Sequence, residues 1–521
     1  SNSTDLKQEA PKKKPVLSKD QERLAGCRPL KTLLKLSVGP LLSQITGAFY
    51  GIVTTLWVSK AIGTNGMSAI SLMNSFDGLG RAFGFFIGTS GSSQISYLIG
   101  QRKLDETGQL IADYIRISII LGIIVAAILL PCLKPAARWF GANKETIEMG
   151  FQYMLPLCIC IFSTCFFLGV GGCLQGEGRS FFFGIVNLIA IVCNMLILNP
   201  LFLFGFKTGI VGAGLSNAIA EAVPGFILIF LYFRGKFFVK PKFNMLFKKF
   251  SPYTISSLKV GVSQLVSNLS LSLPSILIRK FLGNKTKENF DDVMAAFNVG
   301  VRICQLCNAV LIAVTAGYLP AGSYAYAAKL YKRLVRLFLH SLWLNLSWAA
   351  FISIFSWAIP KQIGTLFSSS NRNYLKYCKE LIRALSGFTI FQAFRYNCQT
   401  FLQSLQKGVT ATILSFINNF VATCGFAFIF YYWHSNNEVL VAYSFAASYI
   451  FSMVLSICVI ARPFFRILKK AKNSQINEVN EPIERELEDV SKSNDDSDDT
   501  SESVNRSEER RVGKECRSRW S

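Results

Sequence analysis

The sequence predicts an all-α membrane protein in which twelve transmembrane helices form two pseudo-symmetric six-helix lobes around a central cleft. Three observations predict this fold. Residues between Leu30 and Ile467 are almost entirely long apolar stretches, and only 17% of the whole chain is charged. The charged residues gather at the ends of these stretches and in the two tails. The second half of the stretches also repeats the first, weakly but in order, which is typical of proteins that rock one half against the other.

Twelve stretches are each long enough to cross a membrane, since about 20 helical residues span a hydrocarbon core of about 30 Å. A large soluble helical protein would need polar faces at the helical period, and these stretches lack them. The expected spans are residues 31–58, 66–98, 110–133, 147–174, 181–205, 210–233, 253–282, 292–320, 334–358, 375–404, 409–432 and 439–466.

Motifs in the first half recur in the same order in the second half. This duplication predicts a first lobe over 31–250 and a second lobe over 251–470, related by a rotation about an axis along the membrane normal. The recurring pairs are Lys35–Pro40 with Ser257–Val262, Gly91–Tyr97 with Gly322–Ala328, and Leu174–Gly178 with Leu402–Gln406.

Basic residues in the loops predict the orientation. They concentrate around Arg102, over Arg234–Lys249, over Lys329–Arg336 and from Arg462 onward, whereas most of the opposite connections are short and nearly neutral. Because cytoplasmic loops carry the excess of Lys and Arg, both termini are expected in the cytoplasm, which requires an even number of spans. The membrane could be the plasma membrane or an internal one.

The two tails are expected to lack stable structure. Residues 1–30 form a basic arm, and residues 471–505 form an acidic, Ser-rich tail that is poor in apolar residues. Residues 506–521 resemble a translated sequencing adapter and are excluded from the interpretation of the fold. The formal charge of +24 comes largely from residues that flank the spans, so it is explained by topology and anionic lipid rather than by nucleic acid.

Composition also argues against enzymes, metal proteins and receptors. The Cys304-x-x-Cys307 pair has no second cysteine pair or histidine cluster to accompany it, and the chain contains only His340 and His434. We therefore expect no metal and no cofactor. No Gly-x-Ser-x-Gly turn or other nucleophile–base set is present, and a seven-helix receptor would not produce a two-fold repeat.

Several motifs resemble those of one known family, the multidrug and toxin extrusion (MATE) family. The resemblance runs over about 31–470 and is carried by Leu198–Phe206 followed by Gly209–Gly214, by Gly317–Pro320 followed by Gly322–Arg333, by Gly88–Ser96 and by Tyr232–Lys236. It implies two six-helix lobes around a cleft, and export of drugs or metabolites in exchange for protons or sodium.

The chain departs from this family at positions where ionisable groups are expected. Thr54 and Asn199 stand where the family usually has aspartate, and Gln392 stands where one branch has an acid. The departures leave open whether H⁺ or Na⁺ is the coupling ion, and whether this chain is ion-coupled by that route.

Charged residues remain within the first-lobe spans, where each is costly enough to indicate function. Asp77 and Arg81 lie one turn apart on one helix, so they are expected to pair. Glu221 has no basic neighbour in its span before Arg234, which favours a titratable group facing the cleft. The alternative is a set of structural ion pairs that lock helices together.

The second lobe contributes Arg302 and Arg395, and an arginine without an acid partner would favour anionic substrates. Aromatic and amide side chains complete the expected cleft wall, because they supply apolar area and a few orienting hydrogen bonds. The expected wall is Phe49, Tyr50, Thr54, Asn194, Asn199 and Glu221 from the first lobe, and Gln264, Asn268, Asn298, Arg302, Gln305 and Arg395 from the second.

The sequence therefore predicts a secondary active transporter, an antiporter that exports small amphipathic organic compounds by alternating access. Its expected partners are the lipid bilayer and a small-molecule substrate, with no nucleic acid, and it is expected to act as a monomer. The alternative is a flippase for a lipid-linked oligosaccharide or another anionic lipid, with Arg81, Arg302 and Arg395 holding a phosphate. Several arginines in a cavity open sideways to lipid would favour the flippase, and a closed aromatic cavity would favour export of organic compounds.

Overall fold

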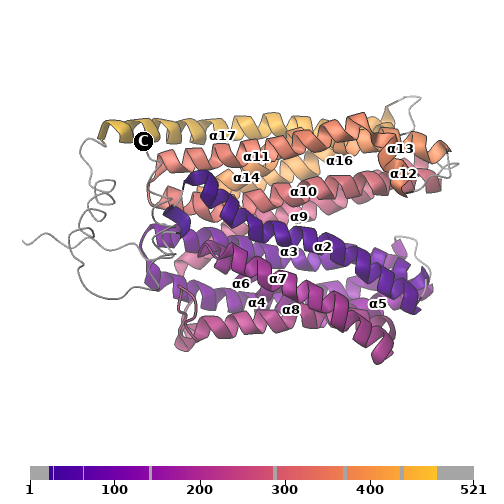
Figure 1. Ribbon diagram of the computed structural model, residues 1–521, viewed down its shortest axis with the longest axis horizontal. Helices are drawn as coiled ribbons and strands as arrows, with labels where there is room; N and C mark the ends of the chain where they lie inside the picture. Colours follow the sequence, from indigo (N-terminus) through magenta and orange to yellow (C-terminus); the bar gives the residue numbers. More distant parts are fainter. Residues whose placement is uncertain are drawn as a thin grey trace, which may run out of the picture.

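The computed structural model describes residues 23–26, 28–62, 64–139, 144–285, 290–367, 372–433 and 439–477, and these residues form no strand. Long helices run side by side along the longest axis of the molecule (Figure 1). The helices that form the first lobe are α2 (Pro29–Ile62), α3 (Thr64–Gly100), α4 (Leu104–Trp139), α5 (Lys144–Ile159), α6 (Ile161–Gly176), α7 (Ser180–Cys193) and α8 (Gly209–Phe233). Those of the second lobe are α9 (Pro252–Lys285), α10 (Phe290–Ala327), α11 (Tyr331–Ala358), α12 (Pro360–Phe367), α13 (Arg372–Ser386), α14 (Thr389–Ser404), α15 (Gly408–Phe416), α16 (Ala422–Tyr432) and α17 (Ser444–Asn477).

The helices correspond to the twelve expected spans. Eight of them are long and apolar enough to cross a membrane by length and composition, and α5 with α6, bent by 54° at Cys160, counts as a ninth. The remaining three expected spans are occupied by α2, by α3, and by α13 followed by α14. The break between α13 and α14 at residues 387–388 was not expected, because hydropathy locates a span but not an interruption inside it.

The two halves of the chain form two layers (Figure 1). The first-lobe helices, indigo to magenta, lie below the second-lobe helices, which are rose to yellow, and α2 runs along the boundary. Across this boundary α2 packs on α10, and α3 packs on both α9 and α10. A linker over residues 234–251, with the short helix η3 (Phe243–Phe247), joins α8 to α9.

The duplication extends to the geometry of the turns. Arg102 follows α3 with a φ of 61°, and Lys329 follows α10 with a φ of 59°. Gly178 and Gln406, with φ values of 80° and 60°, occupy the corresponding places after α6 and α14. In all four turns the N–H of this residue donates three positions back, and the next N–H donates five positions back. Each helix therefore ends in the same left-handed turn, which satisfies its last carbonyl groups.

The lobes contact each other at the end of the bundle that carries the linker and the last turn of α17, here called the linker end. The Oγ atoms of Ser93 on α3 and Ser323 on α10 lie 3.2 Å apart. Gln406 donates a hydrogen bond of 2.8 Å to Ser93 Oγ, and the rings of Tyr97 and Tyr326 lie 6.4 Å apart. The recurring motifs of the sequence thus meet each other across the lobe boundary.

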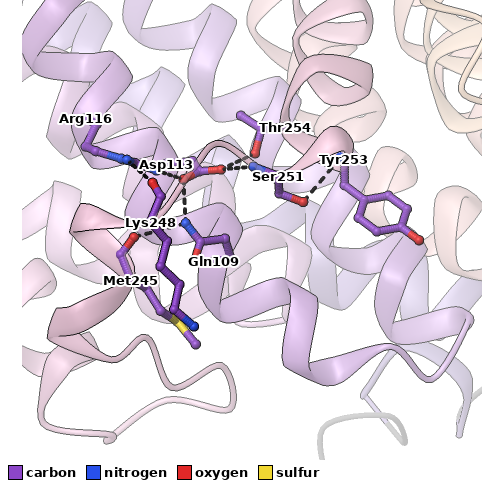
Figure 2. Close-up of polar contacts among 8 residues, drawn as sticks. All are labelled: Gln109, Asp113, Arg116, Met245, Lys248, Ser251, Tyr253 and Thr254. Atoms are coloured by element: carbon purple, nitrogen blue, oxygen red, sulfur yellow. Dashed lines mark hydrogen bonds and ion pairs between the residues drawn. The ribbon is translucent and has the colours of Figure 1, made fainter.

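A buried carboxylate on α4 holds the start of the second lobe (Figure 2). Asp113 is fully buried, and its Oδ2 accepts hydrogen bonds from Ser251 N at 2.9 Å and from Thr254 Oγ1 at 2.6 Å. Its Oδ1 accepts one from Gln109 Nε2 at 2.8 Å and pairs with Arg116. Asp113 thereby caps the first turn of α9 and ties it to the first lobe.

The second and fourth spans approach backbone to backbone. A Cβ at Gly88 on α3 would lie 2.7 Å from Leu168 O, and a Cβ at Gly172 on α6 would lie 2.0 Å from Gly88 O. Only glycine allows this contact, because any side chain would force the helices apart. The close approach brings the middle of α3 next to α6 at membrane depth.

The fifth span of each lobe contains π-helical turns. In the first lobe these are η1 (Asn194–Leu198) and η2 (Leu201–Gly205), and in the second lobe η5 (Ile417–Val421). Such turns leave some backbone groups out of the regular ladder and are frequent at functional sites. Buried asparagines, Asn194 in η1 and Asn419 in η5, lie in these turns.

The expected disordered N-terminal arm over 1–30 is too long. Residues 23–25 are helical, and Leu24 is fully buried in the core. Its carbonyl accepts a hydrogen bond of 2.9 Å from Arg333 Nη2 in the second lobe. A single apolar residue that packs into the core is enough to order a short segment. The average composition of the arm does not reveal such a residue. Residues 1–22 lie outside the described residues.

The expected acidic tail over 471–505 also begins too early. Helix α17 continues to Asn477, and Ala471 is buried against the bundle. Residues 478–521, which include the adapter-like segment 506–521, lie outside the described residues.

A second buried carboxylate, Glu177, lies in the turn between α6 and α7. It accepts hydrogen bonds from Tyr232 Oη at 2.9 Å, from Phe238 N at 3.2 Å and from Val239 N at 3.4 Å. Burial raises the pKa of the Glu177 carboxyl from 4.5 to about 7, although the Tyr232 hydrogen bond and the nearby Arg179 act in the opposite direction. Glu177 thus fixes the start of the linker to the end of α6.

This raised pKa predicts that stability falls as pH rises. Between pH 4.5 and about 7 the folded protein holds a proton on Glu177 that the unfolded chain releases, so the stabilisation is complete below this window and lost above it. The loss amounts to about 3 kcal/mol. The thermal midpoint of the wild type is expected to fall between pH 5 and pH 8, and that of Glu177→Gln to fall less. The exposed Glu145→Gln variant is the control and should follow the wild type, and an identical pH profile for Glu177→Gln would contradict the prediction.

Candidate functional site

Three first-lobe spans converge on one charged cluster, defined as Asp77, Arg81 and Glu221. Arg81 on α3 donates from Nη1 to Glu221 Oε1 on α8 at 2.7 Å and contacts the same oxygen through Nη2. The Nε atom of Arg81 lies 3.6 Å from Asp77 Oδ2, one turn earlier on α3. Thr164 on α6 donates a hydrogen bond of 2.5 Å to Glu221 Oε2. Two carboxylates share one guanidinium, so the fully ionised cluster has a net charge of −1.

Glu221 has no basic neighbour in its own span, as the sequence indicates, but it has a basic partner on another helix. Its partner is Arg81, which lies 140 positions earlier in the chain and on a different helix. The expected contact between Asp77 and Arg81 is present, but it is the longer of the two. The structure therefore reverses the expected roles of the two carboxylates. Glu221 is held by Arg81 and Thr164, and Asp77 is the less restrained of the two.

The charged cluster is accessible from the side of Asp77. The side chains of Arg81 and Asp77 are 35% and 26% exposed, against 10% for Glu221. Glu221 is thus buried among the helices, whereas Asp77 can be reached by a small ion.

Three neutral side chains of the expected first-lobe wall, Asn194, Asn199 and Thr54, are buried. Asn194 donates from Nδ2 to Tyr50 Oη at 3.1 Å, which ties the fifth span to the first. Asn199 is fully buried, and its Oδ1 accepts a hydrogen bond of 2.8 Å from Ser216. Thr54 is also buried. Asn199 and Thr54 therefore lie inside the helix packing, and the side chain of Phe49 lies outside the described residues.

A buried arginine occupies the interior of the second lobe. Arg395 on α14 is only 3% exposed, and its Nη1 donates to Asn419 Oδ1 in η5. The Arg395 guanidinium carbon lies 4.9 Å from the Tyr396 ring centre and 5.8 Å from that of Tyr449 on α17. In the described part of the chain, its Nη2 has no hydrogen-bond partner.

The structure places the other expected second-lobe residues on α9, α10 and α14. Asn298, Arg302 and Gln305 share one face of α10 and are exposed, and Arg302 lies on a different helix from Arg395. On α9, Gln264 Nε2 lies 3.5 Å from Asn268 Oδ1. Gln392 is buried one turn before Arg395, and its Oε1 has no partner among the described residues.

Comparison with known proteins identifies the family. The MatE family model matches residues 41–201 and 265–433, which is more than half of the chain. The chain belongs to the MatE family. Members of this family are membrane transporters and not enzymes, and the helices of this MatE protein are long and apolar enough to cross a membrane many times, as in a multi-pass integral membrane protein.

Curated relatives of this MatE protein are multidrug exporters by name. "Multidrug export protein MepA" of Staphylococcus haemolyticus is 23% identical over 303 residues, which are 57% of this chain and 65% of that protein. The protein of the same name from Staphylococcus aureus (strain NCTC 8325 / PS 47) is 22% identical over 309 residues, with the same coverage. The match thus spans less than two thirds of the length of these relatives.

Solved structures share the fold of this MatE protein. An outward-facing conformation of a multidrug resistance MATE family transporter has a TM-score of 0.77 and 21% identity, covering 87% of this chain and 100% of that chain. A MATE protein in the bent conformation also has a TM-score of 0.77, with 22% identity and coverage of 88% and 100%. A transporter from Pyrococcus furiosus, described as having a binding pocket of reverse polarity, has a TM-score of 0.77 and 21% identity, with coverage of 87% and 99%. These likenesses establish the twelve-helix, two-lobe fold.

Arg81 and Arg395 of this MatE protein do not form a common phosphate pocket. Arg81 is already neutralised by Glu221 and Asp77, and Arg395 lies inside the other lobe between α9, α14, η5 and α17. The arrangement gives no support to the flippase alternative, which needs several free arginines in one cavity.

Sequence reasoning missed three residues of these sites. Thr164 and Tyr449 lie in apolar runs where a single polar residue carries no signal. Asn419 follows Asn418 within the eleventh span, and two adjacent amides at membrane depth are a signal that could have been used.

Proposed function

We propose that this protein is a secondary active transporter that exports small amphipathic organic compounds by alternating access, in exchange for an ion. The observation that supports it most is the charged cluster with one carboxylate in excess. Ionisable groups at membrane depth are costly and are retained where they carry ions or substrates. Family membership and the names of the multidrug-export relatives support the choice of cargo.

The charged cluster is suited to coupling because it can exist in two charge states. With both carboxylates ionised its charge is −1, and binding of one proton or one Na⁺ makes it neutral. Asp77 is the proposed ion carrier, since Glu221 is occupied by Arg81 and Thr164. An ion that binds one conformation better than the other shifts their populations, and this difference couples the ion to the motion of the lobes.

The orientation follows from charge. Basic residues of the linker, such as Lys248 and Lys249, favour a cytoplasmic linker end. With the lobes in contact at that end, this proposed orientation would make the structure a state closed to the cytoplasm, as expected after release of an exported compound. Both lobes come from one chain, so a monomer contains the complete transport unit.

Reconstitution into lipid vesicles tests this proposal. Full-length protein should move the fluorescent cation ethidium when either a pH gradient or a sodium gradient is imposed, and dissipating the gradient with an ionophore should stop the movement. Monodisperse, inserted protein that moves no ethidium under either gradient would count against an ion-driven exporter of organic cations.

A further inference from the structure

A buried cation without a counter-ion lies in the second lobe. Arg395 is 3% exposed, and no Asp or Glu of the described residues lies within 4.0 Å of it. Its Nη1 is used by Asn419, but its Nη2 is buried with no partner in the described part of the chain. An arginine is always ionised, so this charge cannot be removed by deprotonation. A buried guanidinium with a free N–H group is a site prepared for an anion.

The sequence of the second lobe places no acid close to Arg395 along its span. The nearest acidic residue along the chain is Glu380, about four helical turns before Arg395 and beyond the break between α13 and α14. The only acidic residues of 251–470 are Glu288, Asp291, Asp292, Glu380 and Glu438. Four of these lie at or next to the connections between spans, and Glu380 lies in the first turns of the span over 375–404, so no acid lies in the middle of a span of this lobe.

Contacts from several spans hold Arg395 in place, and the residues around it are here called the Arg395 cluster. Asn419, which accepts from Arg395, itself donates from Nδ2 to Ser267 Oγ at 3.1 Å, and this contact fixes the amide. The rings of Tyr396 and Tyr449 flank the guanidinium at 4.9 and 5.8 Å. Four spans therefore hold the guanidinium in one position, as a preorganised site requires.

We propose that the Arg395 cluster, formed by Arg395, Tyr396, Asn419 and Tyr449, binds the carboxylate of an amphipathic organic anion. The proposal deepens the proposed export function and rests on it. A carboxylate matches the planar guanidinium, and the two tyrosine rings offer apolar surface to an aromatic body. The lobes would then divide their roles, with ion coupling at the charged cluster of the first lobe and substrate recognition at Arg395 in the second lobe.

A purely structural role for Arg395 predicts a different result. If the guanidinium only braces Asn419 and the rings, then replacing it should weaken the fold, and an added carboxylate should do nothing. If the Arg395 guanidinium is instead a binding site for an anion, replacing it should not lower thermal stability in the absence of ligand, because the replacement removes an uncompensated buried charge.

The test uses the full chain in lipid nanodiscs, with benzoate as the probe and neutral benzamide as its matched control. Benzoate, but not benzamide, should raise the thermal midpoint of the wild type. Arg395→Gln should weaken benzoate binding, measured by calorimetry, about tenfold or more, since a charge-assisted hydrogen bond is lost. Arg383→Gln removes another second-lobe arginine stacked on a ring, that of Trp357 near the end of α13, and should retain the wild-type response.

A second variant keeps the proposal testable if Arg395→Gln fails to fold. Gln392→Glu places a carboxylate one turn from Arg395, where a buried amide oxygen now has no partner. This built-in anion should raise the thermal midpoint and abolish the response to benzoate. A wild type that ignores benzoate, or benzoate binding that survives in both variants, would overturn the proposal.

Failure of this inference and failure of the proposed function give different results. Benzoate binding needs no ion gradient, so benzoate binding by a protein that moves neither ethidium nor benzoate under any imposed gradient would contradict the proposed function alone. Gradient-driven ethidium transport by a protein that does not bind benzoate would contradict the role of the Arg395 cluster alone.

Discussion

Replacing Asp77 by Asn is expected to reduce gradient-driven transport at least tenfold while leaving the fold intact. Asp77 is the more exposed carboxylate of the charged cluster and makes only the longer contact, 3.6 Å, with Arg81. Its loss removes the excess negative charge, and Arg81 keeps Glu221 as its partner. The cluster is then permanently neutral, so an ion gradient has no group to act on.

Two assays on the same vesicles separate coupling from binding. Uptake of ethidium against an imposed gradient should collapse in Asp77→Asn, whereas exchange of ethidium across vesicles without a gradient should continue. Glu221→Gln should lose gradient-driven uptake and also thermal stability, because the contacts with Arg81 and Thr164 are lost together. Asp105→Asn, an exposed change at the start of α4, should behave as the wild type. Full gradient-driven uptake by Asp77→Asn would show that Asp77 does not carry the ion.

Replacing Arg81 by Gln is expected to cause the largest loss of stability among first-lobe variants. The change leaves Asp77 and Glu221 as two carboxylates without a counter-charge at membrane depth. Breaking a buried ion pair in this way typically costs 3–5 kcal/mol, and about 3 kcal/mol is expected here because a third of the Arg81 side chain is exposed. The loss of stability is measured by thermal unfolding in detergent, which is monitored as the loss of the monodisperse peak.

A double variant distinguishes this cause from a simple loss of packing. Arg81→Gln combined with Glu221→Gln removes the charge left over by the first change, so it should be more stable than Arg81→Gln alone. Acid pH should also restore part of the stability of Arg81→Gln. Equal instability of the single and the double variant, at all pH values, would indicate that Arg81 acts through its bulk.

The fold was largely predictable because the membrane restricts the possible structures. In lipid every backbone group must be paired within a helix, so a long apolar run can hardly become anything else. The duplication could also be predicted, because motifs such as Gly91–Tyr97 and Gly322–Ala328 occur in the same order, and the structure brings these two together at Ser93 and Ser323.

The contacts between helices could not be predicted from one sequence. Periodicity shows which residues share a helix face, and it correctly paired Asp77 with Arg81. It carries no information on Glu221, whose partner lies 140 positions away. The surroundings of Arg395 depend in the same way on α17 and η5, and the docking of Leu24 depends on Arg333.

A reversible crosslink between the lobes measures whether they separate at the linker end during transport. The Oγ atoms of Ser93 and Ser323 lie 3.2 Å apart, so cysteines at both positions are close enough for a disulfide. Oxidised Ser93→Cys/Ser323→Cys protein should lose transport of ethidium, reductant should restore it, and each single cysteine variant should transport with or without oxidant. Undiminished transport by fully crosslinked protein would contradict alternating access by movement of the two lobes.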